Sequence, residues 1–239
     1  MADFDNQVLR GRGTTADVAL DQGLRAYMVG VYQYMMLGIA LTGAVAWVVS
    51  MQTPFIEAVT SSRLLLMLVA FAPLPVSIYL QLRISKMTAG TAQGLFWLYS
   101  AMMGVWFGVL LALFTDESFI RVFLITAASF GALSLYGYTT KRDLTGLGSF
   151  ALMGCAGLFF VTLFAWIFPT PMLINVICVV GLLVFAGLTA YDTQQIKAMY
   201  NESDDTDAST RRSILGALWL YISFSAIFQY LLQLIGDRE

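Results

Sequence analysis

The sequence predicts an all-α integral membrane protein with seven transmembrane helices. Hydrophobic residues make up 59% of the 239 residues and charged residues only 12%, whereas about a quarter of the residues of a soluble protein are charged. The charged residues are also grouped, which leaves long uncharged stretches. Because about 20 apolar residues cross a bilayer, the chain has room for roughly seven crossings and for no additional soluble domain.

Uncharged stretches mark the membrane spans, because an ionised side chain near the bilayer centre costs about 3 kcal/mol. The first four spans lie between Arg25 and Glu57, between Arg63 and Arg83, between Lys86 and Asp116, and between Arg121 and Lys141. Pro73 and Pro75 fall inside the second span and predict a kink there, since proline interrupts the backbone hydrogen bonds of a helix.

The last three spans follow from proline and charge. Residues 144–191 carry no charge and contain Pro169 and Pro171 near the middle. This stretch has about twice the length of one span, so it predicts a helical hairpin, spans five and six. After an acidic segment at 201–207, residues 213–236 are again uncharged and form span seven. A re-entrant last segment, which would return the tail to the cytoplasm, is the alternative.

We expect a polar N-terminal segment of residues 1–25, a membrane domain of residues 26–236 and a short tail of residues 237–239. The 13 Lys and Arg residues lie in the N-terminal segment and after spans two, four and six, with three exceptions, Arg63, Arg121 and Arg238. Because cytoplasmic loops are enriched in Lys and Arg, this distribution predicts a cytoplasmic N-terminus and an external C-terminus. Short loops and the lack of a targeting peptide favour a bacterial inner membrane.

Composition argues against several functions. A net charge of −2 indicates neither nucleic acid nor another polyanion as a partner. The sequence has no histidine, which removes Ser-His and Cys-His nucleophile pairs and most zinc sites. An intramembrane aspartyl protease needs two acids that share a proton, and only one acid lies inside a span. We therefore expect no enzyme, no cofactor and no bound metal.

Small residues inside the spans are expected to serve helix packing. Gly104 and Gly108 form a GxxxG pattern, which brings helices close together within the bundle or, as the alternative, between two chains. Cys155 and Cys178 both fall in apolar runs, where we expect unpaired thiols that behave as small hydrophobic groups.

The acid inside a span is Asp192, close to the cytoplasmic end of span six. A carboxylate near a helix C-terminus faces an unfavourable dipole, so either the helix continues or a partner compensates. The polar residues Thr189, Thr193 and Gln195 lie nearby, and this arc is predicted to face the bundle interior. The alternative is an interfacial acid that reaches water.

Four segments carry a family resemblance. They are LRAYMVGVY at 24–32, KRDLT at 141–145, YDTQQIK at 191–197 and ALWLYISF at 217–224. In this order, with seven spans, the chain resembles the bacterial branch of the Bax-inhibitor-type family, also called transmembrane Bax inhibitor motif proteins. The resemblance implies a fold in which the last helix is central and the others surround it. It also implies a pH-sensitive cation leak, notably for Ca²⁺, in some members and stress protection in others.

The resemblance also points to site residues. In the family the aspartate of the YDTQ-like motif pairs with an aspartate of the last helix; Asp192 matches the first position, and Ser223 stands at the second. An aspartate beside a serine lacks the like-charge interaction through which two carboxylates share a proton. Asp192, Ser223 and Arg83 are the predicted ion-gate and pH-sensing residues, with Arg83 as a partner that would lock Asp192. The alternative for Arg83 is a cytoplasmic topology marker among the lipid headgroups.

Two functions remain open at this point. The first is a pH-influenced leak for Ca²⁺ or another cation, with a cytoplasmic gate at Asp192. The second is a non-conducting regulator that binds and inhibits a membrane-bound ATP-dependent protease, as some bacterial relatives do. Its polar N-terminal segment would be the handle, although an ordinary disordered terminus is the alternative. The spans offer a cation few polar side chains, among them Gln33, Asn175 and Gln229.

Overall fold

A computed structural model describes residues 2–237, with side chains from residue 21 onward, and this part of the chain is helical and contains no strand. Met1, Arg238 and Glu239 lie outside the described residues, so Asp237 alone represents the predicted tail. The elements are α1 (Ala2–Ser50), α2 (Thr53–Ser61), α3 (Arg63–Phe71), α4 (Pro73–Arg83), the 3-10 turn η1 (Ile84–Lys86), α5 (Ala89–Leu111), α6 (Asp116–Thr139), α7 (Thr145–Ile167), α8 (Pro171–Ala198) and α9 (Thr206–Ile235).

Seven helical segments of the described chain are long and apolar enough to cross a membrane, which confirms the predicted spans. They are Asp21–Ser50 within α1, Arg63–Lys86 across α3, α4 and η1, and the whole of α5, α6, α7, α8 and α9. The second span is interrupted where the kink was predicted, since α3 ends at Phe71 and Pro73 begins α4, and Pro171 begins α8 after the end of α7. Both prolines occupy the first helical turn, where no backbone N–H is needed.

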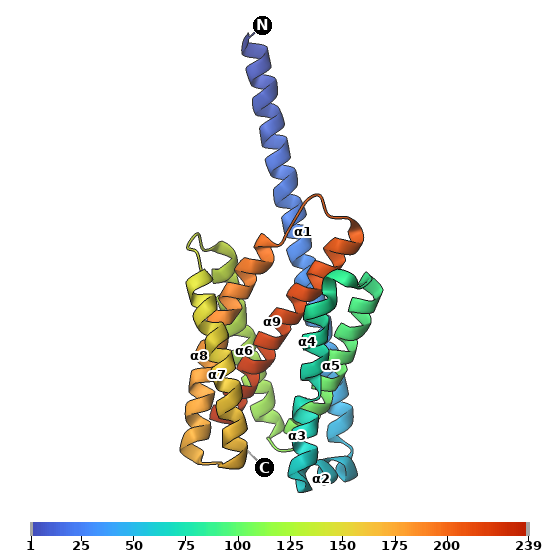
Figure 1. Ribbon diagram of the computed structural model, residues 1–239, viewed down its shortest axis with the longest axis vertical. Coiled ribbons are helices and arrows are strands. Elements are labelled where there is room, and N and C mark those ends of the chain that lie inside the picture. Colours follow the sequence, from blue (N-terminus) through green and yellow to red (C-terminus); the bar gives the residue numbers. More distant parts are fainter. Residues whose placement is uncertain (1, 238–239) are drawn as a thin grey trace.

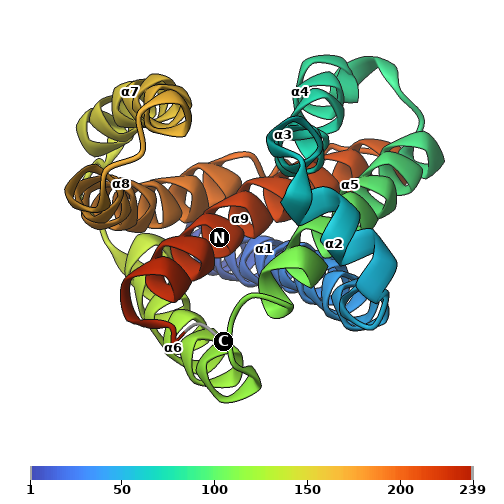
Figure 2. The same cartoon turned by 90° about the horizontal axis from the view of Figure 1, so that it is seen from below.

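The last helix lies at the centre of the bundle, as the family resemblance implies. In Figures 1 and 2, α9 runs diagonally between the helix group α6, α7 and α8 and the group α1, α3, α4 and α5. Its most apolar stretch is 61% buried, against 17–50% for the other six spans. α9 is one unbroken helix, and the two chain ends lie at opposite ends of the molecule (Figure 1). This arrangement favours a complete crossing over a re-entrant segment.

The GxxxG pattern packs α5 against α1 within the chain. A Cβ atom on Gly104 would lie 2.6 Å from Cβ of Val45 and 2.9 Å from the carbonyl oxygen of Thr42, and one on Gly108 would lie 2.7 Å from Cβ of Val49. Only glycine permits this approach, which confirms the expected packing inside the bundle. The two cysteines are free, as predicted.

A buried hydroxyl network joins three helices, and it supplies a test of how polar contacts stabilise the bundle. The Tyr221 hydroxyl of α9 forms a hydrogen bond with Oγ1 of Thr42 on α1 at 2.5 Å, and Thr42 donates to the carbonyl oxygen of Ser100 on α5 at 2.9 Å. Thr42→Val removes both contacts while it keeps the side-chain shape, so we expect a loss of about 1–3 kcal/mol in the free energy of unfolding. Thermal unfolding in detergent should show a lower midpoint for Thr42→Val than for Thr42→Ser, which keeps the hydroxyl. Equal midpoints would contradict a stabilising role.

Candidate functional site

The structure brings Asp192 and Ser223 together inside the bundle. Asp192 lies on α8 and is only 8% exposed, and Ser223 on the central helix is completely buried. The Ser223 hydroxyl donates to Oδ2 of Asp192 across 3.3 Å. At a rise of 1.5 Å per residue, Asp192 lies roughly 9 Å inside the end of α8 at Ala198. The site is therefore within a membrane-spanning segment and close to its predicted cytoplasmic end.

Few groups compensate the charge of this carboxyl. Within residues 21–237, no Lys or Arg forms an ion pair with Asp192. The Cys155 thiol of α7 lies close enough to interact with it electrostatically. The C-terminal end of the α8 dipole is negative, so it does not stabilise an ionised carboxyl there. In membrane proteins a buried ionisable group with so little compensation commonly marks a functional site.

Arg83 lies apart from this pair. It ends α4, is exposed and forms no ion pair with any residue in the range 21–237. The contact between α4 and α9 near this end is made instead by Gln81, whose side-chain oxygen accepts from Nε1 of Trp219 at 3.1 Å. The arrangement in this structure thus contains no lock between Arg83 and Asp192, and a role for Arg83 stays a prediction.

A chain of hydroxyl groups connects α1, α6 and α8 beside the site. Thr193 follows Asp192 and donates to the carbonyl oxygen of Thr189 at 2.8 Å, while its Oγ1 lies 3.0 Å from Oγ of Ser134. Ser134 of α6 also bonds to the Tyr32 hydroxyl of α1. Because the Thr193 hydrogen is used in the bond to Thr189, Ser134 donates to Thr193 and Tyr32 donates to Ser134. The sequence pattern pointed to Thr193 but not to Ser134 or Tyr32. The available signal for Ser134 was a polar residue in an apolar span, and for Tyr32 it was a place in the first motif.

Two of the family motifs bind each other at the end of α8. Gln194 donates through Nε2 to the carbonyl oxygen of Arg142 at 2.8 Å, and its Oε1 accepts from the backbone N–H of Leu144 at 2.9 Å. In the same loop Asp143 accepts from Oγ1 of Thr145 at 2.6 Å and from its backbone N–H at 2.9 Å. These side-chain and backbone hydrogen bonds lower the pKa of the Asp143 carboxyl. The α6–α7 loop is thereby fixed to the helix that carries Asp192.

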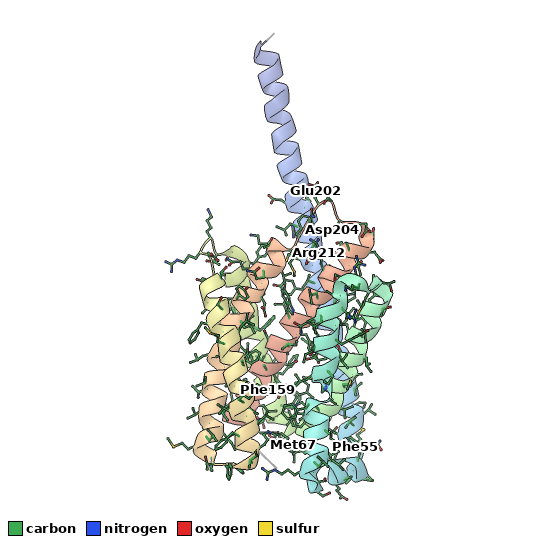
Figure 3. All side chains as sticks on the ribbon, viewed as in Figure 1. Phe55, Met67, Phe159, Glu202, Asp204 and Arg212 are labelled. Carbon is green, nitrogen blue, oxygen red and sulfur yellow. The ribbon has the colours of Figure 1, made fainter. Side chains whose placement is uncertain are left out.

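An ion pair fixes the start of the central helix to the end of α8. Arg212 of α9 lies 3.0 Å from the carboxylate of Asp204 in the α8–α9 loop, and it donates to the carbonyl oxygen of Met199 at 2.6 Å. Figure 3 shows Asp204 and Arg212 side by side at the end of the bundle from which the N-terminal part of α1 projects. Because the loop is held at both ends, it sets how far α9 lies along α8. The contact between Ser223 and Asp192 depends on this register.

The fold and the site define a class: a polytopic α-helical membrane protein with one buried carboxyl beside its central helix. A family model described as "Inhibitor of apoptosis-promoting Bax1" matches residues 24–239. The chain is 40% identical over 219 residues to the inner membrane protein YbhL of Escherichia coli (strain K12). The matched region covers 91% of this chain and 94% of YbhL. It is 39% identical over 250 residues to an uncharacterised protein of Caulobacter vibrioides, across the full length of both chains. The chain therefore belongs to the Bax-inhibitor-type family.

Proposed function

We propose that this integral membrane protein is a pH-influenced leak for cations, and for Ca²⁺ in particular, in a bacterial inner membrane. Its N-terminus would lie in the cytoplasm. The observation that carries the proposal is the buried Asp192 carboxyl, which has one hydrogen bond from Ser223 of the central helix and no ion pair with residues 21–237. The relative name "inner membrane protein" supports the location.

The contact between Asp192 and Ser223 can act as a gate because it joins the two helices that meet there. An ionised carboxylate accepts the Ser223 hydrogen bond and attracts a cation. A protonated carboxyl carries no charge and attracts a cation only weakly. Protonation therefore changes both the helix contact and the attraction for a cation. Neither residue lines either of the two cavities described for the bundle, so conduction requires α8 and α9 to move apart.

We also infer that the protein acts without catalysis. The sequence has no histidine, and the described side chains include no group of three or more Cys, Asp and Glu residues that would hold a metal ion. A passing Ca²⁺ ion would thus meet a single carboxyl instead of a site with several oxygen ligands. Tight Ca²⁺ sites use six to eight oxygen ligands, so weak binding, suited to a leak, is expected.

Calcium flux into proteoliposomes across a pH series tests the proposal. We expect flux above that of empty liposomes, with a pH dependence that Asp192→Asn removes because the amide cannot gain or lose a proton. At the pH of maximal wild-type flux the variant should differ by about ten-fold or more, given the size of a single charge interaction in a partly buried site. Glu117→Gln, which removes an exposed acid at the other end of the bundle, should behave like wild type. Flux no greater than that of empty liposomes would overturn the proposal.

One observation favours a second candidate function. The helix α1 continues from the bundle back to Ala2 and projects away from the other helices (Figure 1). The part before Asp21 extends about 28 Å at 1.5 Å per residue. Such a segment is accessible to a partner, which suits a non-conducting regulator that binds and inhibits a membrane-bound ATP-dependent protease. A protein without Ca²⁺ flux would favour this function.

A further inference from the structure

A long apolar groove separates α1 from α6 and opens on the outer surface of the bundle. Its volume is about 800 Å³, and Phe224 of the central helix lines it together with residues of both outer helices. Its walls include strongly exposed apolar side chains, among them Val29 (48%), Met36 (59%) and Leu135 (63%). Because these side chains lie in membrane-spanning segments, the groove faces lipid.

The length of the groove suits one acyl chain. It extends from Arg25 to Ala40 on α1 and from Phe123 to Tyr138 on α6, which is about 22 Å on each helix. Half of the hydrocarbon core of a bilayer is roughly 15 Å thick. The groove therefore reaches from the headgroup level past the depth of one leaflet, and an acyl chain can lie along its whole length.

Positive charge gathers at one end of the groove. Arg25 lines this end, is exposed and forms no ion pair with any residue in the range 21–237. Tyr138 lines the same end, and the Lys197 ammonium group lies 4.8 Å from the centre of its ring. Arg25 and Lys197 thus place two cations at this end of the groove. A negatively charged headgroup complements this end.

We propose that the groove between α1 and α6 binds one phospholipid with a net negative headgroup, its acyl chain in the groove and its phosphate at Arg25. The site also touches the candidate gate, because Ser134 lines the groove and bonds to Thr193 next to Asp192. Binding of the lipid does not depend on conduction. It would be present even if the protein carried no Ca²⁺.

Two matched pairs of variants test the groove and the headgroup separately. Gly131 lines the groove, and a Cβ atom there would meet nothing within 4 Å, so we expect the indole of Gly131→Trp to occupy the groove. Gly157 of α7 is equally open but lies outside the groove, so Gly157→Trp is its control. Arg25→Gln removes the charge at the groove end, and Lys86→Gln, an exposed cation of η1, is the control for charge alone.

Delipidated protein is mixed with phosphatidylglycerol or phosphatidylcholine of identical acyl chains, and retained lipid is counted by native mass spectrometry. We expect one phosphatidylglycerol per chain in the wild type and in both controls. Arg25→Gln should weaken the preference for phosphatidylglycerol by roughly five-fold, the effect of one basic residue near anionic lipid. Gly131→Trp should lose the lipid. The proposal would be overturned if Gly131→Trp retained as much lipid as the wild type. It would also be overturned if the wild type and Arg25→Gln each retained the two lipids equally. A dimer that Gly131→Trp dissociates, without bound lipid, would show that the groove is instead an interface between two copies.

Discussion

Gly137→Leu is expected to force α6 away from α8 and to lower the midpoint of thermal unfolding by about 10 °C. A Cβ atom on Gly137 would clash with the carbonyl oxygen of Ala190 and lie 2.9 Å from its Cα. These are backbone atoms, which cannot rotate away as a side chain does. Overpacking commonly costs 1–3 kcal/mol and sometimes more, and about 1 kcal/mol shifts the midpoint by about 2–4 °C in a protein of this size. Because Gly137→Leu would displace a whole helix, we expect a loss of stability at the upper end of this range.

The same substitution on α7 provides the control for this prediction. A Cβ atom on Gly157 would meet nothing within 4 Å, so Gly157→Leu should unfold at nearly the wild-type temperature. Gly137→Ala should lie between the two. The midpoints are measured by tryptophan fluorescence during heating in detergent. A midpoint for Gly137→Leu within about 2 °C of the Gly157→Leu value would show that α6 and α8 do not approach this closely.

The spans were predictable because one large energy dominates their positions. A charge in lipid is more costly than any single packing contact, so residues such as Arg63, Lys86 and Asp116 delimit helices whatever the neighbours do. The kink predicted at Pro73 and the hairpin break predicted at Pro171 have a similarly local reason, the missing backbone N–H of proline. The short helix α2 was not predicted, because a nine-residue segment that is mostly exposed has no comparable constraint on its sequence.

The site was predictable only in part. Asp192 was found because a buried acid is rare in a span, and Ser223 was found through the family resemblance. The same resemblance predicted their contact, which the structure shows, whereas the separation of Arg83 from it depends on how α4, α8 and α9 are rotated about their axes. Tyr32 and Ser134 lie 102 residues apart in sequence. No local pattern identifies such a pair, since it forms only when α1 and α6 face each other beside α8.

Ser223→Asp is expected to give the leak a pronounced change in flux near neutral pH. The Ser223 hydroxyl oxygen lies 3.3 Å from Oδ2 of Asp192, so a carboxyl at position 223 would come within hydrogen-bond distance of the first. Two carboxylates held this close repel each other unless one proton lies between them. Uptake and release of that proton would then switch the pair between a bridged and a repelled state. We expect flux to change by about ten-fold as the proton is lost, because the repulsion separates α8 from α9.

Ser223→Asn is the matched control, because it has the shape of aspartate and cannot hold a second negative charge. The double variant Asp192→Asn with Ser223→Asp retains a single acid at the same contact, so the pronounced change should disappear there too. Ca²⁺ flux in proteoliposomes is compared for wild type and the three variants across the same pH series. If Ser223→Asp and Ser223→Asn have the same pH profile, the two positions do not share a proton. A second carboxyl at position 223 would then not switch the contact between α8 and α9.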